Sequence, residues 1–321
     1  MSVPSEMIQS DSPPLTLAYR MPTLSCFSVC PALFRNIWCV SRRKKVIRSV
    51  SNLVDLCSML RLPNSSISST SELAPLSCVD SAMKLEFLGT VPKDPGYPEA
   101  NEDKFAFSED GRRLALCDGA SESFNSKLWA DLLARKFIAD PKVNPEWVAS
   151  ALAEYSATHD FPSMSWSKQA AFERGSFATL IGVEEFEEHQ AVEILAIGDS
   201  ITMLVDCGKL ICAWPFDNPE KFNERPTLLA TLLAHNDFVG GSTFWTRHGK
   251  TFYLEKLTQP KLLCMTDALG EWALKQALAE DSGFIELLSL QTEEQLAELV
   301  VRERAAKRMH IDDSTLLVLS F

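Results

Sequence analysis

The sequence has little of what several functional classes require. It contains five histidines and nine cysteines, and neither residue type shows the spacing of a zinc or copper site. No Ser, His and Asp signature of a nucleophilic triad is present. The four cysteines after residue 82 form no C-x-x-C pair and lie in or beside apolar runs, as buried thiols do. A reducing compartment without a disulfide framework is the simplest interpretation.

Clusters of positive charge are scarce in most of the chain. The formal net charge is -12, and nearly all of the acidity lies after residue 82. Nucleic acids and anionic membranes require clustered Lys and Arg, so we expect neither as the main partner. The apolar stretch at residues 26–40 is interrupted by Arg35 and Asn36 and is too short to span a bilayer. We therefore expect a cytoplasmic protein.

Residues 1–82 differ from the rest of the chain in composition and in residue pattern. They are rich in Ser, Pro and Cys, carry the basic run 42–45, and show no sustained helical or strand period. We interpret them as a disordered extension, or as upstream sequence joined by a wrongly assigned start codon, with Met83 as the true start. An organelle-targeting segment is the less favoured alternative.

Residues 83–321 have the pattern of a folded domain of strands and helices. Alternating or continuous apolar runs predict strands, and helical periodicity with capping residues predicts helices. The expected strands are residues 84–91, 105–107, 113–117, 177–183, 191–196, 201–205, 209–214, 261–265 and 314–319. The expected helices are residues 126–138, a segment beginning at 144–145, and residues 168–174, 269–279 and 292–307. Hairpins and grouped helices predict an α+β sandwich, and residues 215–250 are expected to form a long surface loop or flap.

Carboxylates recur at the ends of these apolar strands. They are Glu102, Asp103, Asp118, Asp199, Asp267, Asp312 and Asp313. Two carboxylates ~4 Å apart repel by roughly 4 kcal/mol at an effective dielectric constant of 20, so a converging group needs metal, protons or separation. Hard oxygen ligands favour Mg²⁺ or Mn²⁺. A turn-forming role is the alternative for each, and for Asp199 a turn or core role is favoured over metal binding.

Six short motifs follow one another along the chain. They are Asn-Glu-Asp at 101–103, Cys-Asp-Gly at 117–119, Arg-Gly-Ser-Phe-Ala-Thr at 174–179, Ile-Gly-Asp-Ser at 197–200, Thr-Asp-Ala at 266–268 and Asp-Asp-Ser-Thr at 312–315. In this order and spacing, the segment 83–321 resembles the metal-dependent protein phosphatase 2C (PPM) family. The resemblance implies two antiparallel sheets packed as a sandwich and flanked by helices, with a two-metal centre at one end. It also implies that a metal-bridging hydroxide hydrolyses phosphoserine or phosphothreonine.

The resemblance implies a role for individual residues as well. Asp118 would bridge two Mn²⁺ or Mg²⁺ ions and position the hydroxide, with the Gly119 carbonyl as a further ligand. Glu102 would hold the second metal, whereas Asp267 and Asp312 would hold the first, and a third ion is left open. Two further carboxylates would support this shell: Asp103 and Asp313. The expected substrate is a phosphorylated protein.

The chain departs from the family pattern where the substrate phosphate is handled. Pro98 stands in place of a phosphate-gripping Arg, and Ala120 in place of a His that many eukaryotic members carry as a proposed general acid. Ile201 and Ala268 replace a further Arg and a Gly. Metal binding is therefore better supported than efficient catalysis. Two alternatives stay open: a catalytically weak phosphatase-like binding or regulatory module, and a hydrolase of small phosphoesters.

Several other residues receive structural interpretations. Arg174 could replace the missing phosphate grip, but an ordinary charge at a helix C-terminus is favoured. The histidines lack ligand spacing and are expected at the surface, whereas two tryptophans are expected to pack in the fold. These residues are His159, His235 and His248, and Trp245 and Trp272.

Overall fold

The computed structural model describes residues 83–321, and the predictions for residues 1–82 lie outside this part of the chain. Two five-stranded antiparallel sheets form its centre. The first has the order β1 (Lys84–Val91), β12 (Ser314–Ser320), β11 (Pro260–Met265), β7 (Ile201–Asp206) and β8 (Lys209–Trp214). The second has the order β10 (Gly249–Tyr253), β6 (Ala191–Ile197), β5 (Leu180–Phe186), β3 (Arg113–Cys117) and β2 (Lys104–Phe107).

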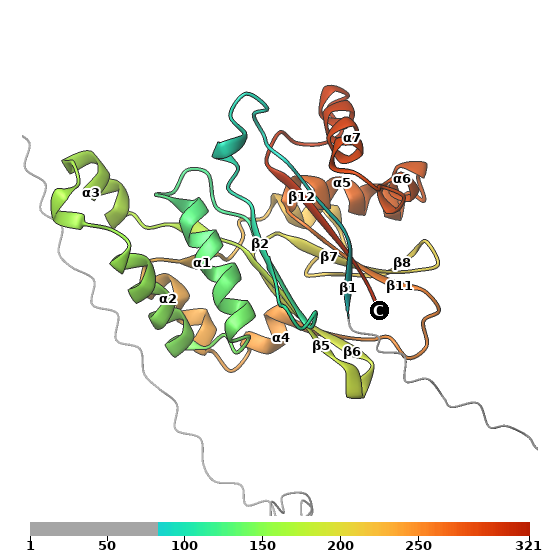
Figure 1. Cartoon of the computed structure of the whole chain (residues 1–321), viewed down its shortest axis with the longest axis horizontal. Helices are drawn as coiled ribbons and strands as arrows, with labels where there is room; N and C mark the ends of the chain where they lie inside the picture. Colours follow the sequence, from blue (N-terminus) through green and yellow to red (C-terminus); the bar gives the residue numbers. More distant parts are fainter. Residues whose placement is uncertain (1–82) are drawn as a thin grey trace, which may run out of the picture. The chain divides into compact units, whose positions relative to one another are not determined.

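Helices cover the outer face of each sheet (Figure 1). The second sheet carries α1 (Ser126–Ala139) and α2 (Pro145–Ala157), and the first carries α5 (Asp267–Leu278), α6 (Ser282–Leu288) and α7 (Glu293–Ala305). Two short helices lie in the connections, α3 (Trp166–Glu173) and α4 (Phe244–His248). The predicted α+β sandwich of two antiparallel sheets flanked by helices is confirmed. No helix within residues 83–321 is long and apolar enough to cross a membrane.

Capping residues begin two of these helices where the sequence predicts it. The Asn144 side chain accepts a hydrogen bond from the Trp147 backbone N–H at 2.8 Å, directly before Pro145 at the first helical position of α2. At the start of α7, Thr292 and Gln295 form a capping box. These side chains satisfy backbone N–H groups that have no partner within the helix.

The apolar runs of the central strands are nearly uninterrupted because both of their faces are buried, whereas the edge strands β1, β2, β8 and β10 are partly exposed. In β3, Leu114 and Leu116 belong to the core between the two sheets, whereas Ala115 and Cys117 belong to the core beneath α1 and α2. All four side chains are buried. Complete burial of a leucine contributes about 1.5–3 kcal/mol relative to exposure, so β3 is firmly held at the point where Asp118 follows it.

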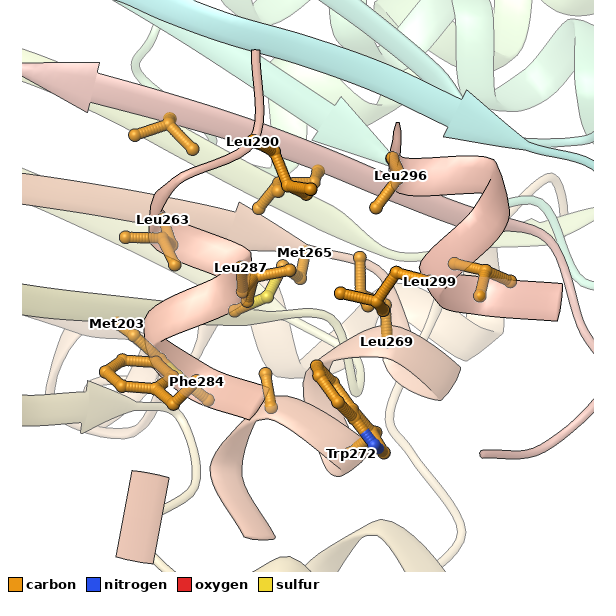
Figure 2. Close-up of a cluster of buried hydrophobic side chains, with 14 of the residues drawn as sticks. Met203, Leu263, Met265, Leu269, Trp272, Phe284, Leu287, Leu290, Leu296 and Leu299 are labelled. Atoms are coloured by element: carbon orange, nitrogen blue, oxygen red, sulfur yellow. The ribbon is translucent and has the colours of Figure 1, made fainter. Parts of the chain in front are cut away.

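A third cluster joins the first sheet to its helices. Figure 2 shows Met203, Leu263 and Met265 from the strands packed against helical side chains that include Leu269 and Trp272. Trp272 is buried, which agrees with its predicted packing role. This cluster fixes α5, and therefore Asp267 at its first position, against the end of β11.

The predicted loop at residues 215–250 is more structured than expected. It contains η4 (Pro219–Asn223), β9 (Leu229–Ala230), η5 (Leu233–Gly240) and α4, and it leads into β10, which pairs with β6. Trp245 lies over Gly249, where an added Cβ would come 2.3 Å from the indole ring. Because such short elements are stabilised by contacts with distant parts of the chain, the local sequence gave no period to detect.

A buried carboxylate ties α7 to α5. Glu303 is 4% exposed and accepts hydrogen bonds from Trp272 Nε1 (3.1 Å), Arg308 Nε (2.7 Å) and Arg302 Nε (3.1 Å). The hydrogen bond from Arg308 is the main reason that the pKa of Glu303 falls from 4.5 to about 2. Its ionised form is therefore favoured in the folded state.

Glu303→Gln is expected to lower the free energy of unfolding by about 2 kcal/mol at pH 7, because a hydrogen-bonded charge is lost from a buried position. The folded-state pKa is depressed, so the contribution of Glu303 is complete above about pH 4.5 and disappears as the pH falls towards 2. Urea unfolding of both proteins at pH 7 and at pH 3 measures this. The exposed Glu298→Gln on the same helix is the control, and an equal effect of the two substitutions would contradict the prediction.

Candidate active site

Four aspartates from both sheets line one cavity of about 160 Å³ at one end of the sandwich. Asp118 follows β3 and Asp199 follows β6, whereas Asp267 lies directly beyond β11 and Asp312 lies just before β12. Since β11 and β12 are antiparallel neighbours, the end of one and the start of the other meet at the same edge. The topology therefore brings together carboxylates that are up to 194 positions apart in the sequence.

Thr179 fixes the backbone at Asp118. Its Oγ1 accepts a hydrogen bond from the Asp118 N–H at 2.9 Å, and its own N–H donates to the Asp118 carbonyl at 2.8 Å. The same hydroxyl lies 2.8 Å from the Ser200 hydroxyl, next to Asp199. One threonine side chain thus links the Asp118 turn to the Asp199 turn.

Thr179→Val is expected to lower the free energy of unfolding by about 1–3 kcal/mol, because the shape is kept while the Asp118 N–H loses its acceptor. Urea unfolding of both proteins tests this. Thr179→Ser keeps the hydroxyl and should behave like the wild type; a serine variant as damaged as the valine variant would contradict the proposed role.

Gly119 lies against the start of α1. A Cβ at this position would come 2.9 Å from the Ser126 carbonyl carbon, so only glycine allows the helix to begin so close to the Asp118 turn. Gly119 also lines the aspartate cavity. Packing thus requires this glycine whether or not its carbonyl oxygen binds an ion.

Asp103 lies in a fully buried position beside the cavity. Its Oδ2 accepts hydrogen bonds from Thr315 Oγ1 at 2.6 Å and Thr266 Oγ1 at 3.1 Å. Its Oδ1 has no hydrogen-bond partner among residues 83–321. Burial, opposed in part by the two threonines, raises the pKa of Asp103 to about 7. A buried oxygen without a partner is costly, and a proton or a nearby cation would relieve that cost.

The cavity carries more negative charge than its surroundings favour. Burial, followed by the charges of Asp103 and Asp267, raises the pKa of Asp118 well above its ordinary value. Burial and the charges of Asp199 and Asp312 raise the pKa of Asp267 to about 7. Such a group of hard oxygen donors fits a divalent cation of the Mg²⁺ or Mn²⁺ type, because the cation would offset the mutual repulsion.

The side chains surround the cavity without converging on a single point. Among residues 83–321, no three His, Cys, Asp or Glu side chains come close enough together to hold a metal ion. The donor chemistry fits a divalent ion, whereas a tight ligand set requires the carboxylates to move closer together. Bound metal should therefore order this end of the sandwich.

Glu102 precedes the buried Asp103 in the sequence and forms an ion pair with Lys93. Lys93 Nζ lies 2.8 Å from its Oε2, and the Ser126 hydroxyl donates to its Oε1. Burial alone would raise the pKa of Glu102, but Lys93, Ser121 and Ser126 outweigh it and lower the pKa. Glu102 is not among the residues that line the cavity.

Asp313 and Arg304 position the loops around these carboxylates. Asp313 is buried; its Oδ1 accepts from the Lys93 N–H at 2.7 Å and its Oδ2 from the Glu102 N–H at 2.9 Å. Arg304 from α7 donates to the Asp312 carbonyl and, at 3.0 Å, to the Pro92 carbonyl. Asp313 therefore holds the Glu102 backbone through main-chain N–H groups, and its role in supporting a metal shell stays a prediction.

The residues that depart from the family pattern have clear places in the fold. Pro98 begins the exposed turn η1 (Pro98–Ala100), and Ala120 lines the cavity. Ile201 is fully buried in the core beneath α5, and Ala268 is buried in α5. Pro98, Ile201 and Ala268 are not among the residues that line the cavity.

Two of the expected surface histidines are partly covered. His248 Nδ1 lies 3.1 Å from the Ala196 carbonyl, its ring packs near Phe238 and Phe244, and burial lowers its pKa. His159 packs against Phe124, Tyr155 and Phe172. Both side chains are half-buried at the surface, because these aromatic rings cover part of each; His235 is exposed as expected.

Sequence reasoning overlooked three residues of the site. Thr179 is the last residue of the motif at 174–179, so the motif itself could have marked it as a residue of the site. Lys93 and Arg304 carried no such signal, because each acts across a long loop or from another helix. Asp199 was assigned to a turn or the core, and the structure places it in the lining of the cavity.

No protein-family model matches the chain, and no curated protein matches it. Solved structures do resemble it. The photosystem II phosphatase PBCP is 15% identical, with a TM-score of 0.45 over 74% of this chain and 99% of that one. The serine/threonine phosphatase Stp1 from Staphylococcus aureus is 15% identical, with a TM-score of 0.44 over 74% of this chain and 94% of that one.

The catalytic domain of the serine/threonine protein phosphatase PstP, in complex with two manganese ions, is 18% identical, with a TM-score of 0.43 over 74% of this chain and 96% of that one. At these identities the likeness concerns the fold.

Proposed function

We propose that this chain is a divalent-metal-dependent phosphatase that hydrolyses phosphoserine or phosphothreonine in proteins. The observation that carries the proposal is the convergence of four strand-end aspartates on one cavity. Asp118, Asp267 and Asp312, with the Gly119 carbonyl, would hold Mn²⁺ or Mg²⁺. Ions held there would act as Lewis acids and lower the pKa of a water molecule, which is the chemistry that phosphomonoester hydrolysis needs.

The chain's own residues supply position and charge. Thr179 holds the Asp118 turn, and Asp313 holds the backbone at Glu102. Asp199 can orient a water molecule in the cavity by accepting its hydrogen bond, since Asp199 lines that cavity. Glu102, now paired with Lys93, would hold a metal ion in the role that the resemblance implies.

Ala120 offers no proton to a leaving oxygen. A serine or threonine alkoxide must then take its proton from water, whereas p-nitrophenolate leaves without one. We therefore expect a larger kcat with p-nitrophenyl phosphate than with a phosphothreonine peptide. Ala120→His should raise kcat for the peptide more than for the small ester; an unchanged ratio of the two kcat values would contradict this expectation.

The function is tested by phosphate release from p-nitrophenyl phosphate and from a phosphothreonine peptide, using the purified full chain. Release should require Mn²⁺ or Mg²⁺, stop with chelator, and return when the ion is restored. Hydrolysis that proceeds at the same rate in chelator would overturn the proposal. Activity on the small ester with none on the peptide would favour a small-phosphoester hydrolase.

A non-catalytic phosphatase-like binding module is the second candidate. It is favoured by the ion pair of Lys93 with Glu102 and by the departures at Pro98 and Ala120. Such a module would bind the phosphothreonine peptide, as measured by fluorescence anisotropy, and would release no phosphate with any divalent ion.

A further inference from the structure

A second, larger hollow adjoins the aspartate cavity. Its volume is about 700 Å³, and it shares three lining residues with the cavity: Ala120, Pro226 and Leu228. The two hollows are therefore contiguous. We call the larger one the arginine groove, because Arg174 and Arg225 are among its lining residues.

The arginine groove is built from two segments that lie far apart in the sequence. Arg174 follows α3, next to Gly175, and Arg225 lies between η4 and β9. These segments are joined where β4 (Phe177–Ala178) pairs with β9, and by the hydrogen bond from the Ser176 N–H to Thr231 Oγ1 at 2.8 Å. The groove is thus a defined part of the fold.

Both guanidinium groups are exposed and available to a ligand. Arg174 Nη1 donates to the Ala170 carbonyl at 3.2 Å, as expected for a charge at a helix C-terminus, and neither Arg174 nor Arg225 forms an ion pair within residues 83–321. Glu122 also lines the groove. Two guanidinium groups against one carboxylate leave a positive balance in a chain whose net charge is -12.

The walls between the charges are partly apolar. Phe177 and Leu228 are half-buried, and the His235 ring meets the Phe177 ring edge-on at 5.7 Å between centroids. A phosphate group alone would need only the aspartate cavity, whereas a polypeptide has further side chains to place. Small apolar walls beside exposed guanidinium groups suit an acidic segment of polypeptide better than a small phosphoester.

We propose that the arginine groove binds an acidic side chain or a second phosphate of a phosphorylated polypeptide, next to the phosphate that is hydrolysed. The proposal rests on the proposed function of the aspartate cavity. It makes Arg174 and Arg225 the residues that select acidic phosphopeptides. They thereby supply anion recognition that Pro98 cannot supply, at a different place in the fold.

The test compares two fluorescent phosphothreonine peptides that differ only in flanking residues, Asp and Glu in one and Asn and Gln in the other. Fluorescence anisotropy with the full chain in chelator, where the proposed hydrolysis stops, gives a Kd for each peptide. The wild type should bind the acidic peptide about 10-fold more tightly, because charge-assisted contacts at exposed sites contribute modestly. Since the effect is electrostatic, the preference should shrink in high salt.

Arg174→Ala with Arg225→Ala should reduce this preference to less than about twofold, and Arg174→Glu with Arg225→Glu should reverse it. Arg247→Ala is the matched control, because Arg247 is exposed, lies outside the groove lining and has no ion pair within residues 83–321. Thermal unfolding of each variant verifies folding. A full acidic preference in both double variants would overturn the proposal, as would a wild type without preference.

The same peptides separate this proposal from the proposed function. If the wild type binds the acidic peptide selectively through the arginines but releases no phosphate with any divalent ion, the groove proposal is supported and the proposed enzymatic function is overturned. If the wild type hydrolyses both peptides with equal kcat/KM and the double variants do the same, the function stands and the groove fails. The ratio of kcat/KM for p-nitrophenyl phosphate to kcat/KM for each peptide gives a further test. If p-nitrophenyl phosphate is preferred over both peptides and the arginine variants leave these ratios unchanged, the groove proposal is contradicted.

Discussion

Asp118→Asn is expected to lower Mn²⁺-dependent phosphate release by more than about 100-fold, the scale at which loss of one charge-stabilising group acts in enzymes. Asp118 is central because its side chain lines the cavity together with Asp267 and Asp312. Asparagine keeps the size of the side chain and removes the charge that a divalent ion needs. Release of phosphate from a phosphothreonine peptide measures the effect.

The same substitution should have the opposite effect on the stability of the metal-free protein. Burial and the charges of Asp103 and Asp267 disfavour the Asp118 carboxylate, so a neutral amide removes a repulsion. We expect the free energy of unfolding in chelator to rise by about 1–2 kcal/mol, in line with the usual trade-off between activity and stability. Asp237→Asn, at an exposed position outside the cavity lining, is the control and should change neither quantity. Wild-type activity in Asp118→Asn would show that another group does the chemistry.

Mn²⁺ is expected to stabilise the fold strongly. An ion present at 100 times its Kd adds about 2.7 kcal/mol to the free energy of unfolding, which corresponds to roughly 5–10 °C in Tm for a domain of this size. The physical reason is the crowding of Asp118, Asp199, Asp267 and Asp312 around one cavity. Thermal unfolding with Mn²⁺ and with chelator measures the shift.

The size of this shift should depend on the cavity carboxylates. Asp267→Asn should lose most of it, because the variant removes one of the proposed ligands, whereas Asp237→Asn should keep all of it. An equal Tm in Mn²⁺ and in chelator for the wild type would contradict the prediction. If Asp267→Asn keeps the full rise in Tm with Mn²⁺, the ion binds at a site other than this cavity.

Much of the fold could be predicted from the sequence because the central strands are buried on both faces. The runs at β3, β7, β11 and β12 are mostly apolar, and Asp, Gly or Pro lies at or near one end of each, where a reader of the sequence can detect it. Asn144 and Thr292 similarly marked two helix starts. At these positions the local sequence signals indicate the same strand ends and helix starts that the folded structure has.

The segment 215–250 could not be predicted in the same way. Its β9 has two residues and pairs with β4 across 50 positions of sequence, so no local period describes it. α6 (Ser282–Leu288) was also missed, since seven residues capped by Asp281 are too few for a clear helical pattern. Both depend on contacts that only the folded chain provides.

The site was partly predictable for a related reason. A carboxylate directly after an apolar run, such as Asp118 or Asp267, is visible in the sequence. Whether it meets other carboxylates depends on strand order, which is why Asp199 was assigned to a turn. The ion pair of Lys93 with Glu102 and the position of the arginine groove depend on loop conformations, for which the sequence has no comparable signal.

The account depends most on the claim that the carboxylates around the cavity bind a divalent cation. Titration of Mn²⁺ into the metal-free full chain by isothermal titration calorimetry tests it directly, beside Asp118→Asn and the control Asp237→Asn. The account predicts saturable binding by the wild type and the control, and at least about 10-fold weaker binding by Asp118→Asn, because one charged ligand is lost. Equal Mn²⁺ binding by the wild type and Asp118→Asn, or none by the wild type, would contradict it.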